Sequence, residues 1–228
     1  MALAKRIAVT LPAGPRIEDT VARIQWAEEQ GIADAWFSDS GAPDTLTQVA
    51  AIAHQTKNIR IGTAVTPVYT RSPSVLAASA NVIGQLLPDR FVMGLGSSSQ
   101  TIMGQFNGIP LDKPLTRVRE TAELVKIMLT GEKTNYDGET LFSKGYRQAP
   151  MENPPPIYLA ALRPKMIEMA AEVGDGVIFN LWPKAALPKM MEHIVIGAAK
   201  AGKKAEDVEI VNRAMVLCTD DKEYGRNL

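Results

Sequence analysis

The chain has 228 residues, 46% of them hydrophobic, and its 25 basic side chains balance 25 acidic ones, which excludes a disordered or fibrous protein and argues against a nucleic-acid partner. One cysteine and two histidines argue against a disulfide framework and a conventional zinc centre, so we expect a reducing compartment and no metal. No apolar run approaches the roughly 20 residues that cross a bilayer, so we expect a cytoplasmic protein without a membrane partner.

Short apolar strands alternate with amphipathic helices along the whole chain. The spacing of apolar residues and the positions of Gly and Pro set the limits of each segment. The predicted strand and helix pairs are 7–11 with 17–31, 35–38 with 44–54, 59–65 with 72–87, 90–95 with 115–129, 157–160 with 165–173, and 176–179 with 183–201. A seventh strand is predicted at 208–217, and a following helix would only be starting at Leu228.

This alternation predicts an α/β fold with a parallel sheet covered by helices, because parallel strands need crossover connections. Seven repeats favour a TIM (β/α)₈-type barrel, shortened after strand seven, over an open doubly wound sheet. The absence of a Gly-, Ser- or charge-rich linker predicts one domain over residues 1–228. The segment 131–142 contains an Asp-Gly turn between strand-like residues and predicts a β-hairpin inserted before strand five.

In such folds ligands bind at the carboxyl ends of the strands. The residues there are mostly uncharged, and no paired carboxylate, elbow serine or histidine stands among them. His54 and His193 fall inside predicted helices and are interpreted as structural. A site of small side chains, backbone amides and apolar walls favours a flat cofactor that brings its own reactivity. The strand-end residues are Asp39 and Ser40, Ala64 to Thr66, Gly96 to Gln100, Ala160 to Arg163, and Asn180 to Trp182.

Two of these segments have the features of anion-binding loops. The run 94–100, Gly-Leu-Gly-Ser-Ser-Ser-Gln, lacks the third glycine of the dinucleotide fingerprint and equally suits an ordinary turn. The run 160–165 opens a helix at Pro164. There Arg163 and Lys165 bring positive charge to the positive end of the helix dipole, which is unfavourable unless an anion such as phosphate binds or the side chains turn into solvent.

Several stretches together resemble the luciferase-like monooxygenase superfamily: 56–65, 69–73, 89–96, 158–166 and 174–176. The resemblance extends through essentially the whole chain. The stretch from Thr66 to Pro73 is most similar to the coenzyme F420-dependent branch that includes methylenetetrahydromethanopterin reductase. The resemblance implies a TIM barrel, a homodimer packed through early helices, and a flavin or deazaflavin ring at the carboxyl ends of the strands.

The resemblance also implies roles for individual residues. A non-prolyl cis peptide bond would lie behind the ring between Ala64 and Val65, and Asp39 would lie near the polar edge of the ring as the candidate for proton transfer. The amides of residues 160–163 would hold the cofactor's phosphate. The cofactor-binding residues implied in this way are Ala64, Val65, Thr66, Gly96, Ser97, Ser98, Ala160, Ala161, Leu162 and Arg163.

The chain departs from the family pattern at three positions. Ser40 stands where the family often has His, Ser99 where it often has an acidic residue, and Arg163 where it often has Gly. The arginine would replace a close backbone approach with a direct guanidinium contact to phosphate. Family members also commonly continue through a seventh helix and an eighth strand, which implies a truncated polypeptide or a partner that covers the gap.

The leading hypothesis is an F420-dependent oxidoreductase that transfers a hydride between C5 of the deazaflavin and a small organic substrate. One alternative is an FMN-dependent monooxygenase, which the missing histidine at Ser40 argues against. Another is a shortened barrel that binds cofactor without catalysis. Met103, Phe106 and Trp182 suggest an apolar pocket, although such residues more often pack in a core.

Overall fold

The computed structural model describes residues 6–40, 43–221 and 223 of the chain. The strands are β1 (Ala8–Thr10), β2 (Asp34–Phe37), β3 (Arg60–Thr63), β4 (Thr66–Pro67), β5 (Phe91–Gly96), β6 (Asn135–Asp137), β7 (Phe142–Lys144), β8 (Ile157–Ala160), β9 (Gly176–Asn180) and β10 (Glu209–Arg213). The α-helices are α1 (Ile17–Glu29), α2 (Thr45–Ile52), α3 (Pro73–Leu86), α4 (Pro114–Leu129), α5 (Pro164–Val173) and α6 (Leu187–Lys200). Short 3₁₀ turns lie at η1 (Ala53–Gln55), η3 (Lys184–Ala186) and η4 (Ala205–Asp207), and a π-helical turn lies at η2 (Thr101–Phe106).

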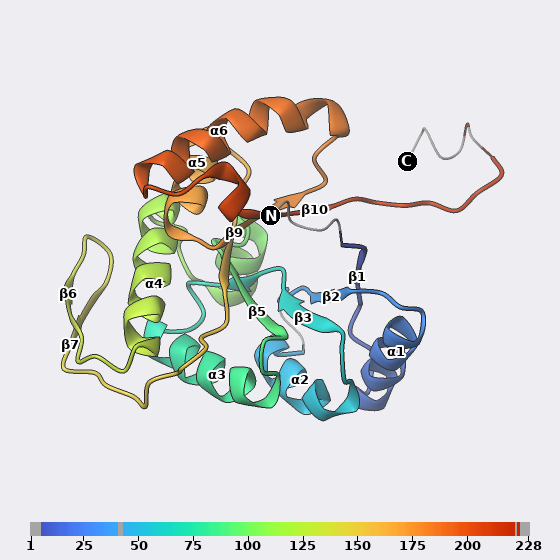
Figure 1. Ribbon diagram of the computed structural model, residues 1–228, viewed down its shortest axis with the longest axis horizontal. Helices are drawn as coiled ribbons and strands as arrows, with labels where there is room; N and C mark the ends of the chain where they lie inside the picture. Colours follow the sequence, from blue (N-terminus) through green and yellow to red (C-terminus); the bar gives the residue numbers. More distant parts are fainter. Residues whose placement is uncertain (1–5, 41–42, 222, 224–228) are drawn as a thin grey trace.

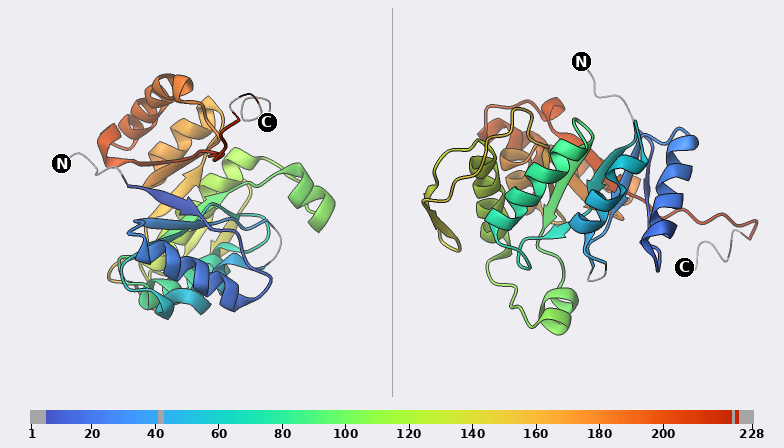
Figure 2. Two further views of the ribbon diagram at one scale, coloured as in Figure 1. Left: turned by 90° about the vertical axis from the view of Figure 1, so that its right-hand side faces the viewer. Right: turned by 90° about the horizontal axis from the view of Figure 1, so that it is seen from below.

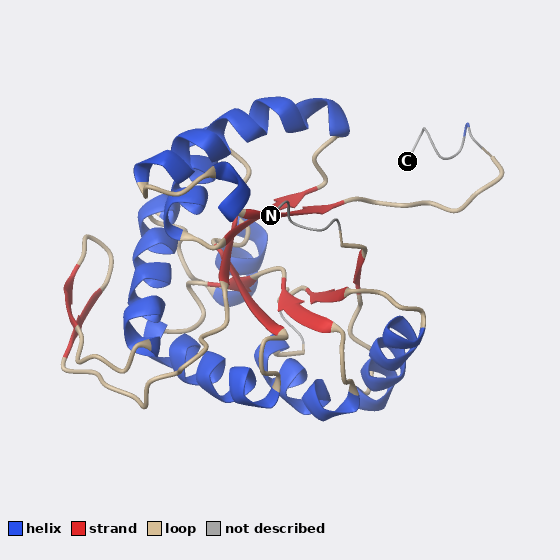
Figure 3. Ribbon diagram, viewed as in Figure 1, coloured by secondary structure: helices blue, strands red, loops and turns tan. Residues whose placement is uncertain are grey.

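The main sheet is a nearly closed parallel barrel. Its strand order is β1-β2-β3-β5-β8-β9-β10, and the short strand β4 also pairs with β5. The helices lie outside the strands (Figures 1 and 3), and two further views show the same enclosure (Figure 2). Within the described residues, β1 and β10 form the two edges and do not pair with each other. The predicted barrel is confirmed over the doubly wound sheet.

Alternate residues of each strand face opposite sides of the barrel wall, as the pleat of a strand requires. In β2, Ala35 and Phe37 belong to the large core between strands and helices, whereas Trp36 belongs to a second cluster inside the barrel. The same alternation places Val92, Tyr158 and Ile178 in the inner cluster with Trp36.

The starts of the helices follow from local capping. The Ser72 hydroxyl accepts a hydrogen bond from the amide of Val75, and Asp44 accepts one from the amide of Thr47 at 2.7 Å. Proline stands in the first turn of α3, α4, α5 and α6, where its missing N–H costs nothing. None of the helices within residues 6–40, 43–221 and 223 combines the length and apolar character needed to span a bilayer.

Two predicted strands end earlier than expected. The strand 59–65 ends at Thr63, which pairs with the last residue of β2, and the chain resumes as β4 beside β5. The strand 208–217 is wrong beyond Arg213, which pairs with Asn180 at the end of β9. Leu181, the residue after β9, has a φ of 58° and turns the chain away from β10. Residues 214–217, which follow β10, therefore have no neighbouring strand and are exposed. They continue away from the body of the protein (Figure 1).

The predicted hairpin is confirmed, with its second strand displaced to residues 142–144. Strands β6 and β7 pair in antiparallel register outside α4 (Figure 1). Glu120 of α4 fixes the turn, because its carboxylate accepts hydrogen bonds from the amides of Glu139 at 2.6 Å and Thr140 at 2.8 Å. These bonds lower the pKa of Glu120 against the opposing effect of burial. The hairpin therefore packs on the helical layer and takes no part in the barrel wall.

A polar cluster closes the amino-terminal end of the barrel. Arg60, the first residue of β3, donates from Nε and Nη2 to both carboxylate oxygens of Asp34 at 2.9 Å. It also binds Glu209, the first residue of β10, with a 3.0 Å contact from Nη1 to Oε2. Tyr158 donates to the same Glu209 oxygen at 2.7 Å, and Arg6 pairs with Asp34 at 2.7 Å. The cluster ties β10 to β2 and β3 across the interior.

Candidate active site

A cavity of about 1560 Å³ opens at the carboxyl ends of the strands and continues down the barrel toward the edges β1 and β10. Its walls are mainly apolar and include Ile102, Met166, Leu187 and Met191. Most of the predicted site residues line it, although they come from four separate loops: Asp39, Ala64, Val65, Ser97, Ser98, Ala160, Ala161, Leu162 and Arg163. Thr66 and Gly96 are buried behind these residues.

Three small strand ends meet to form one floor of this cavity. A methyl group added to Gly96 would lie 2.6 Å from Cγ2 of Val65 and 3.1 Å from Cβ of Ala160. The absence of a side chain at Gly96 therefore allows the β3, β5 and β8 ends to approach closely. The peptide bond between Ala64 and Val65 is cis, as the resemblance implies. The next residue in the chain, Thr66, has a buried Oγ1 atom without a hydrogen-bond partner among the described residues.

The serine run forms a tight turn at one rim of the cavity. Ser98 has a φ of 63°, in the left-handed region, and Ser97 is half-buried beside it. Ser99 accepts a hydrogen bond from the amide of Ile102 at 3.3 Å, which begins the turn η2. The segment around η2 projects from the barrel end (Figure 2). The hydroxyls of Ser97 and Ser98 are thus held at the cavity by a short, strained loop.

The amino-terminal end of α5 forms another rim. Arg163 occupies the N-cap position of this helix, but no side chain accepts a hydrogen bond from the first amides of α5. The exposed Arg163 guanidinium has no partner among the described residues. Lys165 instead pairs with Glu168 at 3.1 Å. The positive charge that remains uncompensated at the positive end of the helix dipole is therefore that of Arg163. The amide of Ala161 donates to the carbonyl of Ile178 at 3.1 Å, so the predicted row of free amides at 160–163 is wrong at this position.

Asp39 is a buried acidic group that lines the cavity at the carboxyl ends of the strands. Its side chain is 8% exposed, and Oδ2 accepts a 2.7 Å hydrogen bond from Nη1 of Arg71. Burial raises the pKa of Asp39 above its usual range, and the Arg71 guanidinium opposes that rise. The stretch containing Arg71 indicated only the resemblance, so sequence reasoning missed this contact. The signal that could have found it is a basic residue in the connection between β4 and α3, at the same end of the barrel as Asp39.

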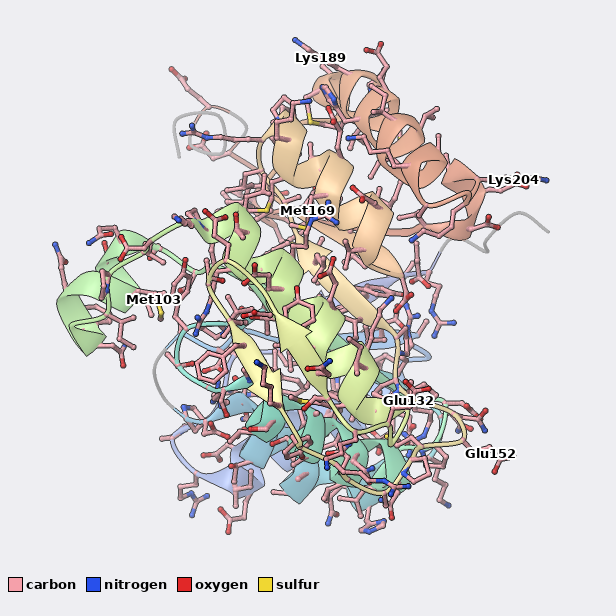
Figure 4. All side chains as sticks on the ribbon, turned by 90° about the vertical axis from the view of Figure 1, so that its left-hand side faces the viewer. Met103, Glu132, Glu152, Met169, Lys189 and Lys204 are labelled. Carbon is pink, nitrogen blue, oxygen red and sulfur yellow. The ribbon has the colours of Figure 1, made fainter. Side chains whose placement is uncertain are left out.

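The aromatic and sulfur-containing residues expected in the pocket do not line it. Met103 is fully buried in the projecting segment (Figure 4), Phe106 is exposed, and Trp182 packs against the main core. Of the neighbouring residues Ile102 and Met103, Ile102 lines the cavity and Met103 does not. The spacing of apolar residues in the sequence could not distinguish the two.

Neither histidine contributes to the cavity lining. His54 lies in the turn η1, just beyond α2, and is exposed there. His193 lies in α6, with Nδ1 3.2 Å from Glu168. Two lysines, Lys165 and Lys200, contact the same buried carboxylate, so His193 belongs to the charged packing between α5 and α6. In Figure 4, Lys189 and Lys204 point away from the body near the two ends of α6.

A family model described as luciferase-like monooxygenase matches residues 1–226. The chain belongs to this family. It is 32% identical over 201 residues to a 5,10-methylenetetrahydromethanopterin reductase of Methanolobus tindarius, covering 88% of this chain and 61% of that protein. It is 31% identical over 216 residues to an F420-dependent glucose-6-phosphate dehydrogenase of Nocardia farcinica, covering 87% of this chain and 64% of that protein. The chain therefore spans less than two thirds of the length of both relatives.

The fold of this family member is similar to that of a solved coenzyme F420-dependent tetrahydromethanopterin reductase of Methanopyrus kandleri. The TM-score is 0.84 at 22% sequence identity, over 91% of this chain and 65% of that structure. The likeness at this identity concerns the fold, and it confirms the barrel derived above. With the family established, the resemblance to its F420-dependent branch is confirmed by relatives at the level of the sequence.

Proposed function

We propose that this family member is an F420-dependent oxidoreductase that transfers a hydride between C5 of the deazaflavin and a small organic substrate. The observation that carries the proposal is the floor of small residues at Val65, Gly96 and Ala160, beside the uncapped start of α5. A flat ring needs such a floor, and a phosphate needs such a helix end. The F420-dependent relative supports the choice of deazaflavin.

Two features of the chain fit a bound deazaflavin cofactor. The cavity of about 1560 Å³ extends from the carboxyl ends of the strands along the barrel interior to the edges β1 and β10, and it exceeds the roughly 300 to 1,000 Å³ of ordinary ligand pockets, so a molecule of cofactor size fits within it. A side chain at Gly96 would collide with Val65 and Ala160, so the close approach of these two residues depends on the absence of a side chain there.

Different residues would bind the ring and the phosphate of the cofactor. Val65 and Ala160, which meet over Gly96, would support the ring, and the hydroxyls of Ser97 and Ser98 would contact its side chain. The guanidinium of Arg163 and the first free amides of α5 would bind the phosphate, because an anion there is favoured by the helix dipole. When bound, the deazaflavin would supply a carbon centre that accepts or donates hydride.

The protein's own contribution would be binding, orientation and proton control. The apolar walls at Ile102, Met166, Leu187 and Met191 would exclude water from the face on which the substrate stacks. Asp39 is the ionisable group of the cavity rim that we assign to proton transfer at its Oδ atoms, since it is buried yet lines the cavity. An Asp39→Asn variant that retains full turnover would remove this role.

The test is equilibrium binding of F420 and, separately, of FMN to the purified chain, followed by fluorescence. Arg163→Ala is measured beside Lys165→Ala, a control at the same helix end whose charge Glu168 already compensates. We expect F420 binding that weakens in Arg163→Ala by about 1.5 to 3 kcal/mol, or about 10- to 150-fold in Kd, and much less in Lys165→Ala.

The other outcomes distinguish the alternatives. Binding of FMN but not F420 would favour a flavin-dependent monooxygenase. Binding of F420 without reduction of any substrate would favour a cofactor-binding protein without catalysis. Equal weakening of F420 binding in Arg163→Ala and Lys165→Ala would contradict the phosphate site at Arg163. The loss of affinity would then follow from the removal of one positive charge at either position.

A further inference from the structure

We propose that Arg71 is a positioning residue that serves as the counter-ion of Asp39 and directs one of its carboxylate oxygens to the cavity, with Asp44 as a second anchor. The inference rests on the proposed function in that Asp39 is the assigned proton-transfer group. The observations that carry it are geometric: one guanidinium is clamped between two carboxylates that come from different ends of the loop between β2 and α2.

The first observation is how Asp39 is held. Its Oδ2 atom accepts a 2.7 Å hydrogen bond from Nη1 of Arg71, and among the described residues Arg71 is the only hydrogen-bond partner of Asp39. The residue also lines the cavity, with 8% of its side chain exposed. Oδ2 is therefore bound to Arg71, and we assign Oδ1 to a molecule in the cavity.

The second observation is how Arg71 itself is held. Its Nη2 atom contacts Oδ2 of Asp44, and the other oxygen of Asp44 accepts the amide of Thr47 at 2.7 Å to cap α2. The Arg71 side chain is only 15% exposed. Because the capped helix fixes Asp44, Arg71 retains an anchor when Asp39 changes its charge. A guanidinium is suited to this role, since its planar fork can serve two carboxylates at once.

The third observation concerns charge. The charged groups of the described chain that act on Asp39 are Arg71, which favours its ionised form, and Asp44, which disfavours it. Burial disfavours ionisation more strongly than either and raises the pKa of Asp39. Without Arg71 the carboxyl group would be buried, close to a second carboxylate and without a counter-ion. Its proton would then be retained to a higher pH.

The experiment measures the titration of Asp39 by carbon-13 NMR of labelled aspartate side chains in the purified chain, with Asp39→Asn identifying the signal. We expect Arg71→Met to raise the titration midpoint of Asp39 by about 1 to 3 pH units. Arg71→Lys should raise it less, because an ammonium supplies the charge but not the planar fork. This second variant also keeps the test available should Arg71→Met fail to fold.

Asp44→Asn tests the second anchor. Asparagine caps a helix as well as aspartate does, so α2 is retained, but its single acceptor oxygen is then taken by the amide of Thr47 and the contact with Arg71 is lost. The lost negative charge alone would lower the midpoint of Asp39, so a midpoint that rises or stays level in Asp44→Asn supports the anchor. An unchanged Asp39 midpoint in folded Arg71 variants would overturn the proposal, and a lower midpoint in Asp44→Asn would overturn the anchoring role of Asp44.

An activity arm separates this proposal from the proposed function. If the chain reduces a substrate with F420, the acid limb of its kcat/KM profile should move to higher pH in Arg71→Met by the same amount as the NMR midpoint, because a base must be ionised to act. A chain without turnover would contradict the proposed function, while the NMR titration, which needs no cofactor, would still decide the role of Arg71.

Discussion

Replacing Gly96 by alanine tests the packed floor of the cavity directly. The added methyl would lie 2.6 Å from Cγ2 of Val65 and 3.1 Å from Cβ of Ala160, whereas carbon atoms normally approach to about 3.5 to 4.0 Å. Val65 would have to withdraw by about 1 Å, and its branched side chain has few rotamers that allow this. Overpacking of this kind costs about 1 to 3 kcal/mol of unfolding free energy.

For a chain of this length, such a loss corresponds to a fall in Tm of about 2 to 12 °C. The assay is thermal unfolding followed by circular dichroism, with Gly84→Ala as the control. The methyl added at Gly84 meets the mobile end of Met151 at 2.6 Å, and alanine is favoured over glycine in the interior of α3 by about 0.5 to 1 kcal/mol. We expect Gly84→Ala to leave Tm unchanged or higher.

The same pair of variants separates packing from binding. If the floor supports a flat ring, Gly96→Ala should weaken F420 binding while Gly84→Ala leaves it unchanged. The reasoning would be refuted by a Gly96→Ala protein whose Tm lies within about 1 °C of the parent chain, because the three strand ends could not then be in the close contact described.

Two further predictions concern charged clusters away from the cavity floor. Arg60→Met should cost about 3 kcal/mol in urea unfolding, because it leaves the buried carboxylate of Asp34 and the half-buried carboxylate of Glu209 without their shared counter-ion. A loss below about 1 kcal/mol would contradict the cluster as described. Hydrogen bonds from Lys200 and Lys165 lower the pKa of Glu168 to about 2, so its contribution to stability is complete above pH 4.5 and is lost as the pH falls toward 2. The stability difference between the parent chain and Glu168→Gln should therefore narrow as the pH falls from 4.5 to 3, and a constant difference would show that Glu168 is not held by these lysines.

Much of the barrel could be predicted because its signals are local. Buried strands such as 90–95 are short apolar runs, and helices such as α3 and α5 begin at Ser72 and Pro164, whose capping and ring chemistry act over a few residues. The parallel order then follows from the length of the crossovers. The limits of the strands could not be predicted in this way. Strand β10 ends at Arg213 because its neighbour β9 ends at Asn180, which is a property of the pair.

The candidate site shows the same division. The sequence indicated which strand ends would carry it, and the family resemblance placed the cis peptide at Ala64–Val65. Local patterns did not indicate which charges remain free: Lys165 is paired with Glu168, whereas Arg163 is unpaired in the described structure. The reason is that such a pairing depends on the position of a side chain one helical turn away and on the packing around it.

The contacts that the sequence alone left undetermined are those between distant segments. Arg71 meets Asp39, which is 32 residues earlier in the chain, and Arg60 meets Glu209, which is 149 residues later. Hydrophobic periodicity fixes which face of a helix or strand is buried, but it carries no information about which polar side chains meet across a barrel. The sequence by itself therefore determined the repeating strands and helices and the neutral character of the strand ends. The tertiary structure decided the charge environment of Asp39 and the closing of the barrel base, because both depend on strand register and on burial that only the assembled sheet creates.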